Sequence, residues 1–241
     1  MRRFEVKGIT KSFGGLAAVK EVSFTVTPGE TLGLIGPNGA GKTTLFHLIT
    51  GFIRPDRGEV RCDGESLVGR RPSAICKRFG ITRTFQIVRP LAHLTVLENV
   101  LVGALCRTRS IRAATPGALS ALERVGLADR AGDLAGSLPI GQRKKLEIAR
   151  ALATRPQLLL LDEVMGGLHS HEIEGVIALL KELKQEGLTL IVVEHVMKAI
   201  LALSDRIVVL NFGEKIAEGI PSEVVSHPEV IRAYLGEEAV S

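Results

Sequence analysis

Apolar and polar residues alternate along the first thirty residues of the chain. The apolar positions are Phe4, Val6, Ile9, Val22, Phe24 and Val26. A period of two is typical of strands that bury one face. A turn at Pro28-Gly29 then precedes the next apolar segment. The pattern therefore predicts an antiparallel sheet at the start of the chain.

Three mostly apolar segments farther along predict the strands of a parallel sheet. Segment 158–161 is an unbroken apolar run, as is typical of a central parallel strand that is covered on both faces. Segments 31–35 and 188–193 also have the pattern of buried strands. A helical pattern follows segment 31–35 at 44–49 and segment 158–161 at about 171–186. Alternating strands and helices predict a parallel α/β core.

The rest of the chain predicts a helical insertion and several short elements. Residues 90–152 are mostly helical in pattern, with breaks at 115–117 and 136–141, and predict an inserted helical subdomain. The shorter elements are strands at 59–62 and 81–86, a hairpin at 207–210 and 215–218, and two helical pieces in 221–235. We predict a single domain over residues 1–241, with its hairpin and tail at about 205–241.

A glycine-rich loop at 36–43 separates segment 31–35 from the helix that follows it. Its sequence fits G-x-x-x-x-G-K-[ST] at every fixed position. Glycines let backbone N–H groups turn inward, and the helix N-terminus adds a positive end, so the loop is expected to hold phosphate oxygens. Lys42 can reach the β- and γ-phosphates, and the Thr43 hydroxyl can bind Mg²⁺. The residues predicted to contact a nucleotide are Gly36, Pro37, Asn38, Gly39, Ala40, Gly41, Lys42, Thr43 and Thr44.

Two acidic residues, Asp162 and Glu163, end the apolar run at 158–161. The carboxyl ends of parallel strands form the edge at which ligands bind in α/β folds. Asp162 is predicted to bind Mg²⁺ through water, and Glu163 to orient or deprotonate the water that attacks the γ-phosphate. Taken by itself, the motif could be a strand that ends in solvated acids. Together with the phosphate loop, it favours catalysis.

Two further polar residues follow predicted strands at the same edge. His195 comes after segment 188–193, and its neutral imidazole could hydrogen-bond the γ-phosphate or the attacking water. Gln86 follows the strand at 81–85, and its amide could bind Mg²⁺ and contact that water. Each has a simpler interpretation by position alone, as a surface histidine and as a polar loop residue.

Segment 138–142 precedes another helix, which has apolar positions at Leu146, Ala149 and Ala153. Its Pro and Gly are ordinary signals for the start of a helix. A second exposed helix N-terminus is nevertheless a second anion site. Because the phosphate loop already supplies one such site, this pattern suggests that a second subunit completes each nucleotide pocket.

Composition and charge exclude several classes of function. The chain has 241 residues, of which 45% are hydrophobic, so it can bury a sizeable core. Aromatic residues make up only 4%, which argues against a base-stacking nucleic-acid surface. The net charge of +5 suits nucleotides, anionic lipids or acidic partners without distinguishing them. No apolar run approaches the ~18 residues of a membrane span, so a role at a membrane would need a partner.

The three cysteines, Cys62, Cys76 and Cys106, form no C-x-x-C pair. This spacing predicts neither a disulfide framework nor a zinc site, and it favours a reducing cytosol.

Taken together, these motifs resemble those of the ATP-binding subunits of ABC transporters, over roughly residues 3–236. The motifs follow the family's order: the loop at 36–43, Gln86, a signature segment at 138–142, Asp162-Glu163, and His195. The resemblance implies hydrolysis of ATP with Mg²⁺. It also implies the α/β fold of P-loop NTPases of the ABC type, with a parallel sheet core, an N-terminal antiparallel β subdomain and a helical subdomain at about 90–152.

The resemblance implies further site residues and partners. Phe13 matches the aromatic residue that stacks on adenine, and Leu138, Gly141 and Gln142 match the signature residues that meet the partner's ATP. The implied partners are a second ABC ATPase subunit, identical or different, transmembrane permease subunits and, indirectly, a substrate-binding protein, with no nucleic acid. The implied location is peripheral, at the cytoplasmic face of the inner membrane. The loop around Gln86 and segment 90–110 would receive the membrane subunit.

Within the family, the chain most resembles the ATPases of importers for branched-chain or other hydrophobic amino acids. The segments that carry this likeness are 82–86, 94–100, 146–150, 194–197 and 231–236. Importers of urea or aromatic acids share much of the pattern and are alternatives. A soluble ABC ATPase of DNA repair, translation or iron–sulfur assembly is an alternative from another class.

Four positions depart from the family's pattern. Pro139 and Ile140 replace the usual signature Ser and first Gly, so the hydroxyl that would bond the γ-phosphate in the partner's site is missing. Val164 replaces the usual Pro, and His169 stands where Asn or Asp is usual. Segment 103–120 is shorter than this importer group leads us to expect. These differences keep open a third interpretation, a nucleotide-gated regulatory module with little catalysis.

Overall fold

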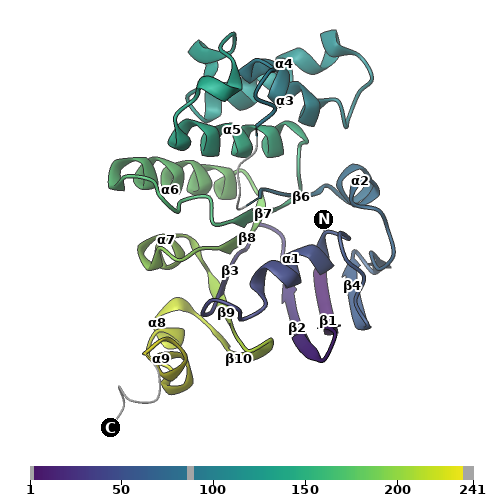
Figure 1. Ribbon diagram of the computed structural model, residues 1–241, viewed down its shortest axis with the longest axis vertical. Helices are drawn as coiled ribbons and strands as arrows, with labels where there is room; N and C mark the ends of the chain where they lie inside the picture. The colour runs from purple at the N-terminus through teal and green to yellow at the C-terminus, as the bar shows by residue number, and fades with distance from the viewer. Residues whose placement is uncertain (1–2, 86–89, 236–241) are drawn as a thin grey trace.

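The computed structural model describes residues 3–85 and 90–235 of the chain, and its strands form two sheets (Figure 1). The smaller sheet has the order β2-β1-β4-β5, and its paired strands are antiparallel. Its strands are β1 (Phe4–Phe13), β2 (Leu16–Val26), β4 (Arg57–Cys62) and β5 (Glu65–Ser66). The antiparallel sheet predicted from the alternating pattern is therefore present.

The larger sheet has the order β10-β9-β3-β8-β7-β6. Its strands are β3 (Thr31–Ile35), β6 (Ile81–Arg83), β7 (Leu158–Asp162), β8 (Thr189–Val193), β9 (Arg206–Asn211) and β10 (Glu214–Gly219). All neighbouring strands are parallel except β10, which pairs antiparallel with β9 at one edge. The fold is thus α/β with a parallel core, as the apolar runs predict.

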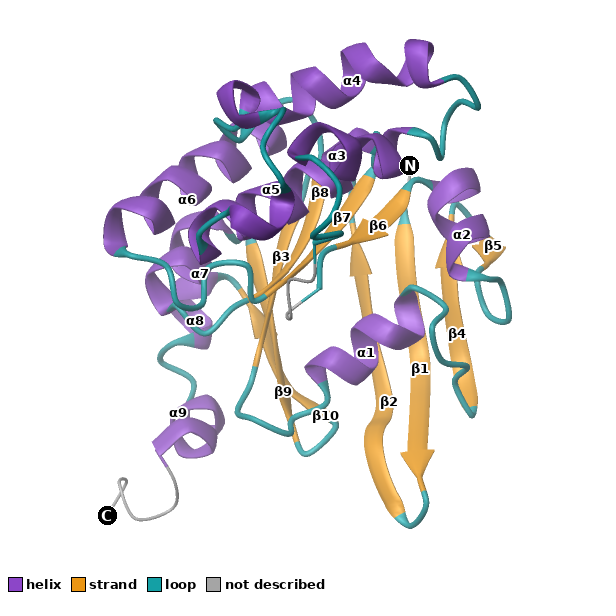
Figure 2. Cartoon of the chain, turned by 45° about the horizontal axis from the view of Figure 1, so that its top comes forward, coloured by secondary structure: helices purple, strands orange, loops and turns teal. Residues whose placement is uncertain are grey.

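The parallel strands are buried on both faces because successive residues enter different apolar clusters. Leu159 and Leu161 belong to the cluster that the strands share with α3 to α7, whereas Leu158 and Leu160 belong to a second cluster. Helix α1 (Lys42–Ile49) packs in that second cluster between the two sheets (Figure 2). This double coverage explains why the strands read as continuous apolar runs.

The middle of the chain forms three helices that pack on one another at one end of the molecule: α3 (Val96–Ala104), α4 (Ile111–Arg124) and α5 (Ile140–Ala153) (Figure 1). Helix α3 begins at a capping box, in which Thr95 and Glu98 each bind the other's backbone N–H. None of the helices in the described ranges combines the length and the apolar character that a bilayer span needs.

The remaining helices lie nearer the two sheets. They are α2 (Pro72–Ala74), α6 (Ser170–Gln185), α7 (Met197–Leu203), α8 (Pro221–Val224) and α9 (Pro228–Leu235), with single turns at Ile75–Phe79, Ala128–Arg130 and Ala135–Ser137.

Two predicted boundaries are wrong. The break expected at 115–117 does not occur, because α4 continues through Pro116. The helix buries Ala114, Ala118 and Leu122, and this packing offsets the hydrogen bond that Pro116 cannot donate. The strand expected at 81–86 ends at Arg83, after which the Thr84 N–H still donates to the Leu160 carbonyl.

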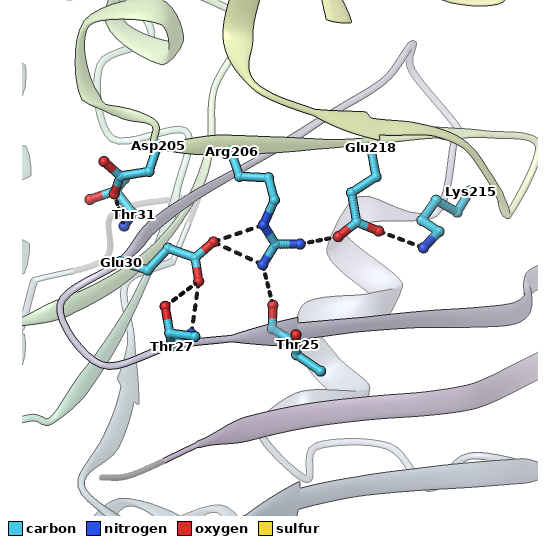
Figure 3. A network of polar contacts seen from close by, with 8 residues as sticks. All are labelled: Thr25, Thr27, Glu30, Thr31, Asp205, Arg206, Lys215 and Glu218. Carbon is cyan, nitrogen blue, oxygen red and sulfur yellow. Dashed lines mark hydrogen bonds and ion pairs between the residues drawn. The ribbon is translucent and has the colours of Figure 1, made fainter. Parts of the chain in front are cut away.

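A polar network joins the two sheets at the end of β3 that lies away from the phosphate loop (Figure 3). The Arg206 guanidinium contacts Oε1 of Glu30 at 2.8 and 2.9 Å, and it also donates to the Thr25 carbonyl and to Glu218. The other Glu30 oxygen accepts from the N–H and hydroxyl of Thr27 at 2.7 and 2.9 Å. Bonds to both sheets fix how the antiparallel sheet sits on the parallel core.

Candidate functional site

The glycine-rich loop connects β3 to α1, as its sequence predicts, and two of its glycines are sterically required. Gly36 has φ of +151° and Gly41 has φ of +99°. A Cβ atom would lie 2.1 Å from the Leu210 carbonyl oxygen at Gly36 and 2.3 Å from the Ala18 carbonyl oxygen at Gly41. Only glycine fits where the loop passes this close to β9 and β2.

A cavity of about 890 Å³ opens beside the loop. It is lined by Gly15, Leu16, Ala17, Ala18, Lys20, Asn38, Gly39, Ala40, Gly41, Lys42, Thr43, Thr44, Glu163 and Phe212. The structure therefore brings most of the predicted nucleotide contacts together with the predicted catalytic Glu163. Pro37 borders a separate cavity behind the loop.

Lys42 is buried against the loop that it follows. Its Nζ donates to the Gly36 carbonyl at 2.6 Å and to the Pro37 carbonyl at 3.0 Å. Burial lowers the pKa of Lys42, and the nearby carboxylates of Glu163 and Asp162 oppose that shift. The ammonium thus lies between the loop and the acidic end of β7, where a phosphate group would need it.

Asp162 forms a buried ion pair with Arg83, a residue that the sequence analysis did not single out. The Arg83 Nη2 lies 2.7 Å from Oδ2 of Asp162, and both side chains are almost fully buried. Burial raises the pKa of Asp162, and the Arg83 guanidinium opposes that shift. Within the described ranges, the buried Oδ1 of Asp162 has no hydrogen-bond partner. An orphaned carboxylate oxygen at this edge fits a Mg²⁺ ion bound through water.

Glu163 and His195 lie together at the ends of the neighbouring strands β7 and β8. Glu163 Oε1 is 2.8 Å from His195 Nε2, and the Glu163 N–H donates to the Val193 carbonyl at 2.9 Å. Glu163 has φ of +51°, in the left-handed region that non-glycine residues rarely occupy. Such strain gathers at functional sites, and here it turns the Glu163 carboxylate toward the cavity beside the phosphate loop.

Two predicted site residues are not part of this constellation. Phe13 is half exposed at the end of β1, where Lys11 Nζ lies 5.6 Å from the centre of its ring. It does not line the cavity, although Gly15 and Leu16 beyond it do. Gln86 lies outside the described residues. Its neighbour Phe85 is partly exposed and contacts Phe52 edge-on, with ring centres 5.8 Å apart.

The signature segment 138–142 lies at the start of α5 and contributes nothing to this cavity. Leu138 and Gly141 are buried, whereas Ile140 is exposed. The Gln142 side chain accepts a hydrogen bond from Arg130 at 2.5 Å. A Cβ at Gly141 would lie 2.1 Å from Oε1 of Glu172, so a larger residue here would require the Glu172 side chain to move. This separation agrees with a segment that serves another subunit's pocket.

Two further charged residues connect these parts, and the sequence analysis missed both. Lys144 of α5 donates to the Glu163 carbonyl at 3.1 Å and to the Gly166 carbonyl. Buried Glu194, next to His195, accepts from the Met165 N–H at 2.7 Å. The start of α5, the loop after β7 and the end of β8 are therefore joined. In the sequence, Glu194 is marked only by its position directly after the apolar segment 188–193, which does not distinguish a buried carboxyl from an exposed one.

The structure shows what surrounds three of the positions that depart from the family pattern: Val164, His169 and Pro139. Val164 is buried. His169 precedes α6, donates its N–H to Glu172 at 2.9 Å and stacks on His171, with ring centres 6.0 Å apart. Pro139 precedes α5 without any side-chain hydrogen bond to the helix. The N-terminus of α5 thus offers backbone groups in place of the usual hydroxyl.

Comparison with known proteins identifies the family. The sequence pattern of the family described as "ABC transporter" matches residues 19–166. The pattern described as "Branched-chain amino acid ATP-binding cassette transporter" matches residues 214–240. The chain is 42% identical to BraF of Pseudomonas aeruginosa, a high-affinity branched-chain amino acid transport ATP-binding protein, over 97% of each chain.

Solved structures agree with this assignment. The ADP conformation of MJ1267, an ATP-binding cassette of an ABC transporter, is 33% identical, with a TM-score of 0.88 over 98% of this chain and 100% of that one. The dimeric structure of MJ0796, a bacterial ABC transporter cassette, is 31% identical, with a TM-score of 0.82 over 90% of this chain and 98% of that one. The chain belongs to the ABC transporter family of ATP-binding proteins, in its branched-chain amino acid group, and is an ATPase with the α/β fold that its motifs predict.

Proposed function

We propose that this chain is the ATP-hydrolysing subunit of an importer for branched-chain or other hydrophobic amino acids. The observation that carries the proposal is the contact of Glu163 with His195 at the cavity beside the phosphate loop. The name of the relative BraF supports the substrate class. We treat residues 1–241 as one ABC ATPase domain, with a helical subdomain at about 90–152 and a C-terminal hairpin and tail at about 205–241.

In this proposal, the phosphate loop and Lys42 hold the triphosphate. The N–H groups of residues 39–44 bind phosphate oxygens at the positive end of α1, and the Lys42 ammonium reaches the β- and γ-phosphates. Phe13 would stack on adenine at the edge of the cavity, next to Gly15 and Leu16, which line it. The hydroxyl of Thr43, the orphaned oxygen of Asp162 and the Gln86 amide would hold Mg²⁺, which neutralises phosphate charge when it is bound.

Glu163 and His195 would carry out the hydrolytic step. The Glu163 carboxylate orients the attacking water and accepts its proton. The N–H at His195 Nε2, 2.8 Å from Oε1 of Glu163, orients that carboxylate before ATP binds, and it would turn to hydrogen-bond the γ-phosphate as negative charge develops. Gln86 would contact the same water.

Two such subunits would share their nucleotide sites. The segment of Leu138, Gly141 and Gln142 would cover the partner's γ-phosphate, because it lies at a helix N-terminus away from its own cavity. Pro139 supplies no hydroxyl there, so the α5 backbone would make this contact. The dimeric form of the related MJ0796 supports the pairing, with identical or different subunits.

The other partners would be permease subunits in the inner membrane and, through them, a substrate-binding protein. The chain would then sit on the cytoplasmic face, with the loop around Gln86 and segment 90–110 against the permease. Phe85, the residue before Gln86, and its ring neighbour Phe52 are partly exposed and support such a contact. No nucleic acid is expected to bind.

Uptake of labelled leucine, phenylalanine and urea by cells that lack the chain tests the proposal. Wild-type chain should restore leucine uptake, and Glu163→Gln should not. Restored uptake of phenylalanine would still agree with a hydrophobic amino acid as the substrate, whereas restored uptake of urea alone would move the chain to a related importer. Purification without any membrane subunit would instead support a soluble ABC ATPase.

A further inference from the structure

The C-terminal helix of the chain contacts the phosphate loop through one side chain. Tyr234 lies on α9, and its hydroxyl oxygen accepts a hydrogen bond from the backbone N–H of Gly36 at 2.8 Å. The two residues are 198 positions apart in sequence. Gly36 is the first residue of the loop, so this contact holds the loop at the point where the chain leaves β3.

Three contacts fix Gly36 in place. The Tyr234 hydroxyl accepts a hydrogen bond from the Gly36 N–H, and the Lys42 ammonium donates to the Gly36 carbonyl at 2.6 Å. The Leu210 carbonyl oxygen lies only 2.1 Å from the position that a Cβ of residue 36 would take. The N–H and the carbonyl belong to the two peptide planes that flank the Gly36 Cα. Together the hydroxyl and the ammonium therefore set the direction in which the loop begins.

Helix α9 is itself anchored to the core of the protein. Val230 is buried in the large apolar cluster, and Ile216 of β10 packs against the same cluster. A cavity of about 740 Å³, lined on one side by Pro37 and Asn38 and on the other by Glu229 and Arg232, separates much of α9 from the loop. Tyr234 contacts the loop from a helix that is packed on the core, at the border of this cavity.

We propose that Tyr234 is a positioning residue for nucleotide binding. A loop that binds phosphate through backbone N–H groups gains affinity when those groups already point at the ligand. Without the hydroxyl, the buried Gly36 N–H would lose its partner, which is unfavourable, and the peptide would turn to find another acceptor. That turn would misdirect the amides farther along the loop. Tyr234 therefore connects the C-terminal helix to the nucleotide site.

The inference rests on phosphate binding at residues 36–44 and not on the transported substrate. Tyr234→Phe tests it, because the ring is kept and only the hydroxyl is lost. We expect the dissociation constant for ATP to rise about threefold to tenfold, with the thermal midpoint lower by only about 2–4 °C. In ¹⁵N-labelled protein, the Gly36 amide resonance should shift, and its hydrogen should exchange faster. Arg232 lies on the same helix, but its side chain donates to the Pro228 carbonyl within that helix. Arg232→Ala should therefore change neither the ATP affinity nor the Gly36 amide resonance.

Three results would overturn the proposal. They are unchanged ATP affinity in Tyr234→Phe, weaker affinity with an unaltered Gly36 resonance, and an equal loss of affinity in Arg232→Ala. Lys42→Ala separates this failure from an error in the loop assignment. If Lys42→Ala binds ATP normally, the loop is not the phosphate site. If Lys42→Ala loses affinity and Tyr234→Phe does not, only the role of Tyr234 is rejected.

Discussion

The Nε2 atom of His195 lies 2.8 Å from Oε1 of Glu163, across the ends of two neighbouring parallel strands. The histidine is half exposed, whereas the glutamate is mostly covered. A catalytic carboxylate needs a fixed direction as well as a suitable pKa. Because His195 binds Oε1 of Glu163, the imidazole helps to set the direction in which that carboxylate points.

His195→Ala should slow hydrolysis more than it weakens binding. The variant removes one hydrogen bond that orients the Glu163 carboxylate, so we expect kcat to fall about tenfold or more, with ATP affinity nearly unchanged. Steady-state phosphate release and equilibrium ATP binding measure the two effects. His171→Ala, an exposed histidine on α6, is the matched control. Equal losses of kcat and affinity in His195→Ala would assign the residue a structural role.

Glu163→Gln should retain ATP and hydrolyse it very slowly. The amide keeps the size of the side chain but cannot accept the proton of the water, so kcat should fall about a hundredfold or more. Single-turnover phosphate release is the measurement. Glu174→Gln, an exposed carboxylate that pairs with Lys198, should hydrolyse ATP like the wild type. Normal turnover by Glu163→Gln would remove this residue from the mechanism.

The sequence predicts the parts of the site that depend on neighbouring residues. Gly36 and Gly41 stand where a Cβ would strike another strand, and such glycines are visible as a motif. The run at 158–161 predicts β7, because a strand that is buried on both faces must be apolar throughout.

The contacts that the sequence does not predict join distant segments. Tyr234 and Gly36 are 198 residues apart, and Arg83 and Asp162 are 79 apart. No local pattern records such pairs, since each depends on how complete elements pack. The helix break predicted at Pro116 is wrong for a related reason. Proline disfavours the interior of a helix by its local preference, but the packing of the buried face of α4 keeps the helix continuous through it.

Arg83→Met should destabilise the protein because it leaves buried Asp162 without its ion partner. The loss of one member of a buried pair costs about 3–5 kcal/mol. Urea unfolding with a global fit to the midpoint and slope measures this loss. Lys198→Met breaks the exposed pair with Glu174, and it should leave the stability nearly unchanged. If the two variants lose the same stability, the pair of Arg83 and Asp162 is not buried in solution.

Glu194→Gln should stabilise the protein increasingly as the pH rises. Burial raises the pKa of Glu194 above its ordinary 4.5, and the Met165 N–H and the Lys144 ammonium oppose that shift. The folded carboxyl therefore holds its proton at pH values at which the unfolded one has lost it. Its contribution to stability is complete below pH 4.5 and falls as the pH rises through the raised pKa of the folded protein. Glutamine has no such dependence and keeps an oxygen for the Met165 N–H.

Urea unfolding of both proteins at several pH values between 4.5 and 8 measures this difference. The free energy of unfolding of Glu194→Gln minus that of the wild type should grow with pH. Glu174→Gln provides the control, because the hydrogen bond from Lys198 lowers the pKa of Glu174, and the contribution of that carboxyl to stability therefore changes only below pH 4.5. Its difference from the wild type should stay flat over the pH values measured. A flat or falling difference for Glu194→Gln would contradict this prediction. It would mean that water or a counter-charge stabilises the ionised Glu194 carboxylate in the folded protein as well as water does in the unfolded one.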